Sequence, residues 1–145
     1  MKNTEQTKKL KNPPSNSVTD IVEAKNGAAS SLRLLFIDAL KDIYWSENAL
    51  VQALPKMAAN SSSPNLKSSI LDHHTMTKNQ VVRLEKVFDF LGQTAKGKKC
   101  EALEGLLNEG DKMLHNTVYG PVRDAGIISS SQKIEHYEIA TYGTL

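Results

Sequence analysis

Apolar residues recur at helical spacing over four stretches of the chain, and the strict alternation typical of β-strands appears nowhere. The first stretch begins at Ser30 or Ser31, either of which can act as N-cap, and runs to about residue 60. Pro55 lies well inside this predicted helix and should bend it. The apolar positions that fall within about 40 degrees of Phe36 on the helical wheel are Leu40, Ile43, Leu50 and Leu54.

Three further helices follow from the same pattern. Ser63 and Pro64 are a typical N-cap and first helical residue, so the second helix is expected over about 64–91, ending at Gly92. A basic turn at 93–99 leads to a shorter amphipathic helix over about 100–116. Gly120 and Pro121 end that segment, and the last helix runs from about residue 122 to the end of the sequence. The pattern therefore predicts an all-α protein of long antiparallel helices joined by short turns.

Composition and charge narrow the possible functions. The chain has 145 residues, enough for one domain, and its net charge is +2. Residues 1–29 carry this whole excess, with five lysines against three acidic residues, and we expect them to form a flexible polar tail before a helical domain at 30–145. The neutral body argues against a nucleic-acid partner, and no segment is apolar enough to suggest a membrane span. A single cysteine, Cys100, rules out an internal disulfide and suits the cytoplasm.

Several polar residues occupy positions that should face the core. Glu47 lies about 20 degrees from Phe36 on the wheel, and His73 takes the same kind of position on the second helix. Glu138 falls on the apolar stripe of the last helix, with Glu135 three residues before it on the same face. A carboxylate in such a position is costly unless it is paired, hydrogen-bonded or bound to a cation. Two interpretations stay open for each residue: a metal ligand, or a member of a buried polar network. On the second helix, Thr77 and Gln80 continue the same polar seam.

Taken together, these residues resemble the donor set of carboxylate-bridged dimetal helical bundles, which use inward-facing Glu and His side chains from several helices. Oxygen-rich sites with a few imidazoles suit iron or manganese. The Glu-x-x-His spacing typical of such sites is absent, however. The sequence also lacks a Gly-rich phosphate loop, a Gly-x-Ser-x-Gly motif and a cysteine pair for zinc, so a general hydrolase or transferase is not supported.

Six ordered segments resemble the YciE/YciF family of bacterial ferritin-like stress proteins. The resemblance covers about residues 32–145. The segments are 36–50 (FIDALKDIYWSENAL), 53–57 (ALPKM), 82–88 (VRLEKVF), 97–107 (GKKCEALEGLL), 122–128 (VRDAGII) and 132–145 (QKIEHYEIATYGTL).

The resemblance implies a ferritin-like antiparallel four-helix bundle. The helix at 100–116 would be an insertion between bundle helices two and three, and the fourth helix would be missing, so that the domain at 30–145 is incomplete at its C-terminus. It also implies a homodimer and a dinuclear iron or manganese centre, with Glu47, Glu135 and Glu138 as carboxylate ligands. His73 would be either an imidazole ligand or a residue that hydrogen-bonds to a ligand. The family has no defined reaction, so the resemblance implies at most a metal-dependent redox role, such as oxidising ferrous iron or consuming peroxide.

The chain departs from the family pattern on the second helix. Thr75 and Met76 stand where family members usually carry acidic residues, and Gln80 stands where many carry a histidine. These differences favour an alternative interpretation, a metal-free helical scaffold or interaction protein in which the same residues form a buried polar network that specifies helix register.

Overall fold

The computed structural model of the chain describes residues 22–145 and contains four helices and no strand within that range. The helices are α1 (Leu32–Ala59), α2 (Pro64–Phe90), α3 (Glu101–His115) and α4 (Pro121–Thr144). The all-α class expected from the hydrophobic pattern is confirmed, and the element boundaries lie within two residues of those expected. Most of the expected polar tail, residues 1–21, lies outside the described residues.

The helix ends follow from local chemistry. Ser31 and Ser63 cap α1 and α2, and each side-chain oxygen accepts a hydrogen bond from a backbone N–H in the first turn. Cys100 caps α3 in the same way through its sulfur. Gly120 precedes α4 with a φ of 127°, a conformation that favours glycine. Helix α1 continues through Pro55 as one element, so this proline does not end the helix.

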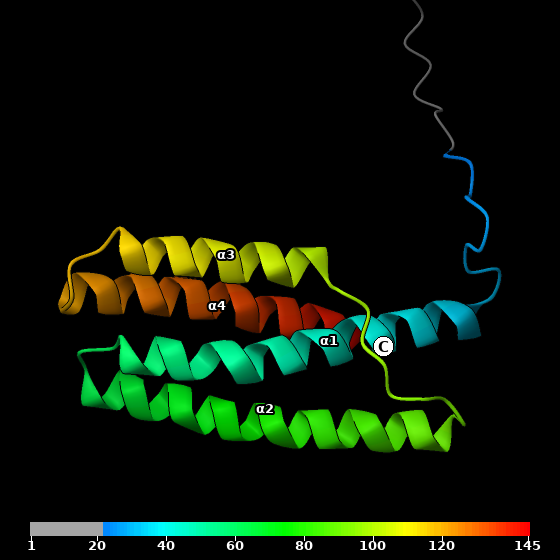
Figure 1. Cartoon of the computed structure of the whole chain (residues 1–145), viewed down its shortest axis with the longest axis horizontal. Coiled ribbons are helices and arrows are strands. Elements are labelled where there is room, and N and C mark those ends of the chain that lie inside the picture. Colours follow the sequence, from blue (N-terminus) through cyan, green and yellow to red (C-terminus); the bar gives the residue numbers. More distant parts are fainter. Residues whose placement is uncertain (1–21) are drawn as a thin grey trace, which may run out of the picture.

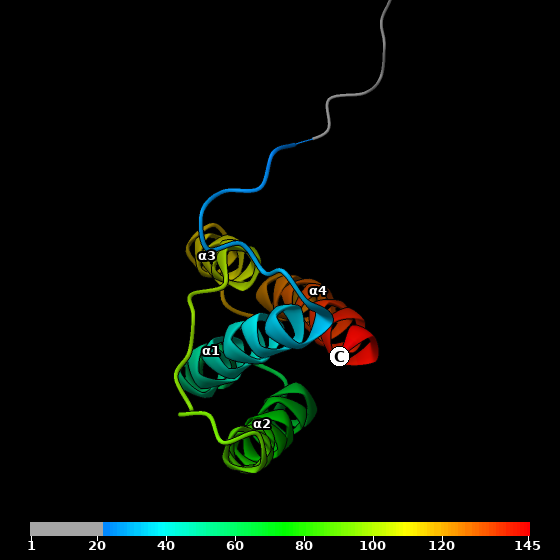
Figure 2. The same cartoon turned by 90° about the vertical axis from the view of Figure 1, so that its right-hand side faces the viewer.

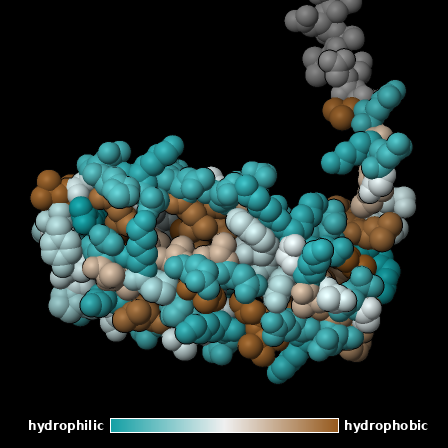
Figure 3. Space-filling model, viewed as in Figure 1, coloured by the Kyte–Doolittle hydropathy of each residue, from teal (hydrophilic) through white to brown (hydrophobic). Residues whose placement is uncertain are grey.

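The helices form two antiparallel hairpins, α1 with α2 and α3 with α4 (Figures 1 and 2). Figure 2 looks along the bundle and shows α1 and α4 in the middle, with α2 outside α1 and α3 outside α4. Helix α4 runs antiparallel to α1, and α2 and α4 run in the same direction. Polar side chains cover most of the face seen in Figure 3, with apolar patches between them.

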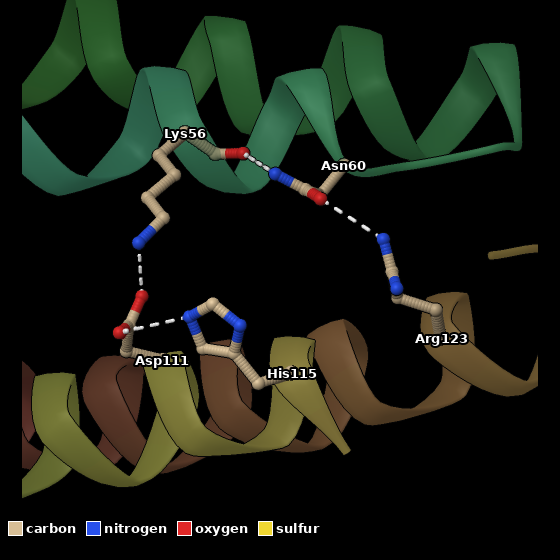
Figure 4. Close-up of polar contacts among 5 residues, drawn as sticks. All are labelled: Lys56, Asn60, Asp111, His115 and Arg123. Carbon is tan, nitrogen blue, oxygen red and sulfur yellow. Dashed lines mark hydrogen bonds and ion pairs between the residues drawn. The ribbon is translucent and has the colours of Figure 1, made fainter. Parts of the chain in front are cut away.

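Two sets of polar contacts join the α1–α2 hairpin to the α3–α4 hairpin at one end of the bundle. Lys56 of α1 pairs with Asp111 of α3, and Arg123 of α4 donates to Asn60 Oδ1 at 3.0 Å (Figure 4). Arg123 also donates to the Thr117 carbonyl at 2.6 Å, in the turn between α3 and α4.

The second set joins α4 to the start of α2. The Asp124 carboxylate, in the first turn of α4, accepts hydrogen bonds from the Ser62 N–H, the Ser62 hydroxyl and the Ser63 N–H at 2.7, 2.6 and 3.0 Å. These bonds hold the pKa of Asp124 below its usual value. The start of α4 is therefore fixed against the start of α2, which sets how the rest of the two helices face each other.

At the opposite end, the connection from α2 to α3 crosses over α1 (Figure 1). The Lys98 N–H donates to the Lys41 carbonyl at 3.0 Å, and the Lys98 ammonium pairs with Asp38 at 3.0 Å. Gly97 lies directly on the backbone of Trp45, where a Cβ atom would come within 2.9 Å of Trp45 Cβ and 3.1 Å of its Cα. This connection needs a glycine because of the close approach.

No helix within residues 22–145 combines the length and the apolar character needed to cross a bilayer.

We predict that Gly97→Ala lowers the free energy of unfolding by about 1–3 kcal/mol, because the added methyl group forces the connection away from Trp45. Gly105→Ala is the matched control. It lies inside α3 with nothing within 4 Å of the added Cβ, so it should stabilise the protein by up to about 1 kcal/mol. Urea unfolding followed by circular dichroism measures both. Equal effects of the two substitutions would contradict the close-packed crossing.

Candidate metal centre

A polar layer interrupts the apolar core at the middle of the bundle. One apolar cluster lies towards the α1–α2 turn and the other towards the crossing connection. Residues from three helices form the layer between them. These are Glu47 of α1, His73, Thr77 and Gln80 of α2, and Glu135, Glu138 and Tyr142 of α4.

His73 lies between two carboxylates of α4. Its Nδ1 is 3.2 Å from Glu135 Oε1, and its Nε2 is 3.4 Å from Glu138 Oε2. Glu135 and Glu138 reach the same ring because residues three apart lie on one face of a helix. One donor atom from each of the three residues lies within 4.8 Å of the other two. Solvent exposure decreases across the cluster. The Glu135 side chain is half-exposed at the surface, and the Glu138 side chain is buried.

Glu47, which belongs to α1, lies beside this cluster. Its side chain is fully buried, and the Tyr142 hydroxyl donates to its Oε1 at 2.7 Å. The pKa of Glu47 is raised from 4.5 to about 7. Burial is the main cause and the neighbouring Glu138 adds to it, while the Tyr142 hydrogen bond acts in the opposite direction. Glu47 and Glu138 therefore share one electrostatic environment, in which the ionisation of one opposes that of the other.

The pKa of His73 is raised above its usual value of 6.5. The interaction with Glu138 is the main cause, and the charges of Glu135 and Glu47 add to it, while burial acts in the opposite direction. A protonated His73 ring can therefore balance the carboxylates on either side of it.

Two buried carboxylate oxygens in this layer have no hydrogen-bond partner. They are Glu47 Oε2 and Glu138 Oε2, since the 3.4 Å approach of His73 to the latter is not a directed hydrogen bond. An ionised oxygen buried in this way is costly, and a cation would remove that cost. Carboxylate oxygens with one imidazole are ligands that iron and manganese accept. The residues present therefore fit a divalent metal ion.

A cavity of about 240 Å³ opens beside Glu138 between α2 and α4. His73, Glu135 and Glu138 line it together with Tyr142. Met76 and Gln80 of α2 also line it.

The structure brings the four residues proposed from the sequence into one region, but only three of them form a cluster. His73, Glu135 and Glu138 form a single cluster, whereas Glu47 reaches it through Glu138 and Tyr142. Sequence reasoning missed Tyr142. Its position in the sequence could have indicated it, because Tyr142 comes four residues after Glu138 and so lies on the same helix face.

Cys100 lies outside the cluster of His73, Glu135 and Glu138. Its thiol is buried and lies 3.1 Å from the Tyr137 hydroxyl, which in turn donates to Asp42 at 3.1 Å. The residue serves as a helix cap in a structural hydrogen-bond network.

We predict that the metal-free protein loses stability as the pH rises from about 5 to 8. Both Glu47 and His73 have raised folded pKa values, so the folded state binds more protons than the unfolded state in this window. The loss from Glu47 should be about 2 kcal/mol. Urea unfolding in a chelating buffer measures it. Glu47→Gln should flatten the dependence, and Asp72→Asn, an exposed acidic residue of α2, should leave it unchanged. A pH dependence that survives Glu47→Gln in full would contradict the assignment.

Comparisons with known proteins place the chain in a family. The family model described as a domain of unknown function, DUF892, matches residues 31–145. The protein YciF of Escherichia coli strain K12 is 39% identical over 112 residues, which is 77% of this chain and 68% of YciF.

Solved structures agree with this assignment. YcfI from Rhodopseudomonas palustris, which has been proposed to be a structural protein, superposes with a TM-score of 0.80 at 36% identity, over 83% of this chain and 77% of YcfI. The E. coli stress protein YciF superposes with a TM-score of 0.76 at 37% identity, over 80% of this chain and 74% of YciF. The chain therefore belongs to the DUF892 family, as its resemblance to the YciE/YciF proteins predicted, and shares the ferritin-like helical-bundle fold of YciF.

Proposed function

We propose that this protein binds iron or manganese at His73, Glu135 and Glu138 and acts as a cytoplasmic, stress-associated ferritin-like protein. The observation that carries the proposal is the convergence of three donor atoms within 4.8 Å beside a buried carboxylate oxygen that lacks a partner. The similarity to the stress protein YciF supports the stress association.

Each residue of the cluster would have a distinct role. His73 would contribute an imidazole nitrogen from α2, and Glu138 would contribute a buried carboxylate from α4. Glu135, more exposed at the surface of the cavity, would complete the set from the solvent side. Tyr142 fixes one oxygen of Glu47 and leaves the other free, so Glu47 can serve a second metal ion in a dinuclear centre. Bound iron or manganese would supply one-electron redox chemistry, such as oxidation of ferrous iron or consumption of peroxide.

We predict that the purified protein retains stoichiometric metal after loading with iron(II) under anaerobic conditions or with manganese(II), followed by gel filtration and elemental analysis. His73→Gln should abolish retention, because it removes the only nitrogen donor of the cluster. His74→Gln is the matched control, since His74 is the neighbouring histidine on α2 and lies outside the cluster. Retention equal in the two variants would rule out this site.

The alternative is a metal-free scaffold, and one observation favours it. The His73 ring already lies within ion-pair distance of two carboxylates, which offsets part of the burial cost and joins α2 to α4. The description of YcfI as a proposed structural protein is in line with that reading. Absence of retained iron and manganese, with a cooperative fold that His73→Gln weakens, would favour the scaffold.

The expected homodimer remains a prediction. Two large apolar side chains beside the cavity, Met76 and Ile139, are 56% and 64% exposed, and contact with a second copy would bury them. We expect sedimentation equilibrium to show a dimer that Ile139→Glu converts to a monomer. Val118→Glu changes an exposed apolar residue at the α3–α4 turn and should not affect the mass. A native monomer would exclude this arrangement.

A further inference from the structure

The cavity between α2 and α4 carries a thioether on its wall. Met76 of α2 lines it, and the Met76 side chain is 56% exposed. The two other methionines in the part of the chain that the structure describes are less accessible. Met57 is buried in the apolar core, and Met113 is half-buried with its sulfur packed against Gly126 of α4. An oxidant dissolved in water therefore reaches Met76 more readily than either of them.

An unsatisfied hydrogen-bond acceptor lies next to this thioether. Gln80 lines the same cavity, and its Oε1 atom is buried without a hydrogen-bond partner. Residues four apart on a helix have their Cβ atoms roughly 5–6 Å from each other, so Met76 and Gln80 project side by side into the cavity. One small molecule can therefore contact both side chains.

The size and charge of the cavity favour a small neutral molecule. Its volume of about 240 Å³ is several times the roughly 30 Å³ that one water molecule occupies in the liquid. Glu135 and Glu138 line it, and none of the described residues that line it is a lysine or an arginine, so an anionic oxidant is repelled. Hydrogen peroxide is uncharged near neutral pH, is little larger than water, and can donate a hydrogen bond to Gln80 Oε1.

We propose that the cavity binds hydrogen peroxide between Gln80 and Met76, and that the Met76 thioether is the group that the peroxide oxidises. The Gln80 oxygen accepts a hydrogen bond from the peroxide and so holds it beside the sulfur atom. A sulfur lone pair forms a bond to one peroxide oxygen while the O–O bond breaks. The proton of the transferred oxygen passes to the departing hydroxide. Sulfur loses two electrons, peroxide gains them, and the products are methionine sulfoxide and water.

This reaction goes beyond the proposed function, because no metal ion takes part in it. The sulfoxide makes an apolar part of the cavity wall polar. Methionine sulfoxide reductases return the sulfoxide to the thioether, so Met76 consumes peroxide repeatedly when a reductase of that class is supplied.

The test compares two methionines in one molecule. Val82→Met introduces a reference methionine on α2 at a position that is 48% exposed and is not among the residues that line the cavity. The full chain is treated with hydrogen peroxide in chelating buffer, and mass spectrometry of its peptides gives the oxidation rate of each methionine. We expect Met76 to react about fivefold faster than the reference or more, a factor that one hydrogen bond to the oxidant can supply. The chain is kept dilute enough to be monomeric, because the expected homodimer would cover Met76.

A second variant tests the role of Gln80. Gln80→Leu removes the amide and keeps a side chain of similar size. Combined with Val82→Met, it should lower the Met76 rate to that of the reference methionine and leave the reference rate unchanged. Asn79→Leu is the matched control, since Asn79 is the exposed neighbour of Gln80 and is not among the residues that line the cavity.

Equal rates at Met76 and at the reference methionine would overturn the proposal, because exposure alone would then govern oxidation. A Met76 rate that a folded Gln80→Leu variant leaves unchanged would also overturn it. The first comparison keeps Gln80, so it decides the matter even if Gln80→Leu does not fold. Chelating buffer makes both rates independent of metal binding, so this proposal and the proposed function can fail separately.

Discussion

The burial of Glu47 and Glu138 inside the bundle is the constraint on which the rest of the structure depends. Both carboxylates lie between two apolar clusters, where an unpaired charge is costly. The surrounding layer offsets that cost in part, through the Tyr142 hydroxyl on one oxygen of Glu47 and the His73 ring near Glu138. One oxygen of each carboxylate remains without a hydrogen bond. This remainder distinguishes the layer from a closed structural network.

The polar layer also determines how the helices sit together. Helices α2 and α4 do not pack closely along their lengths, because α1 lies between them on one side and the cavity opens on the other. Near the middle they are joined through His73 and its two glutamates, and at one end through Asp124 and the Ser62–Ser63 turn. The site is therefore built between the two hairpins. Its geometry depends on the end contacts that fix their relative position.

Structural and metal-binding roles need not compete in this arrangement. An imidazole held between two carboxylates is already close to the geometry in which the three groups can share a cation, so little rearrangement is needed. On α2, Gln80 lines the cavity and the buried Thr77 hydroxyl has no hydrogen-bond partner, so both residues contribute to the polar layer.

The sequence by itself determined the four helices, their caps and the inward direction of Glu47 and Glu138, because helical periodicity and capping depend on residues only a few positions apart. It also indicated that His73, Glu135 and Glu138 were candidates for one site. Only the tertiary structure decided that these three meet as one cluster, that Tyr142 donates a hydrogen bond to Glu47, and that the buried Thr77 hydroxyl has no partner. Those relations join residues up to 95 positions apart. They follow from the register of the α1–α2 turn and from the end contacts that orient α4, and neither leaves a periodic signal in the chain.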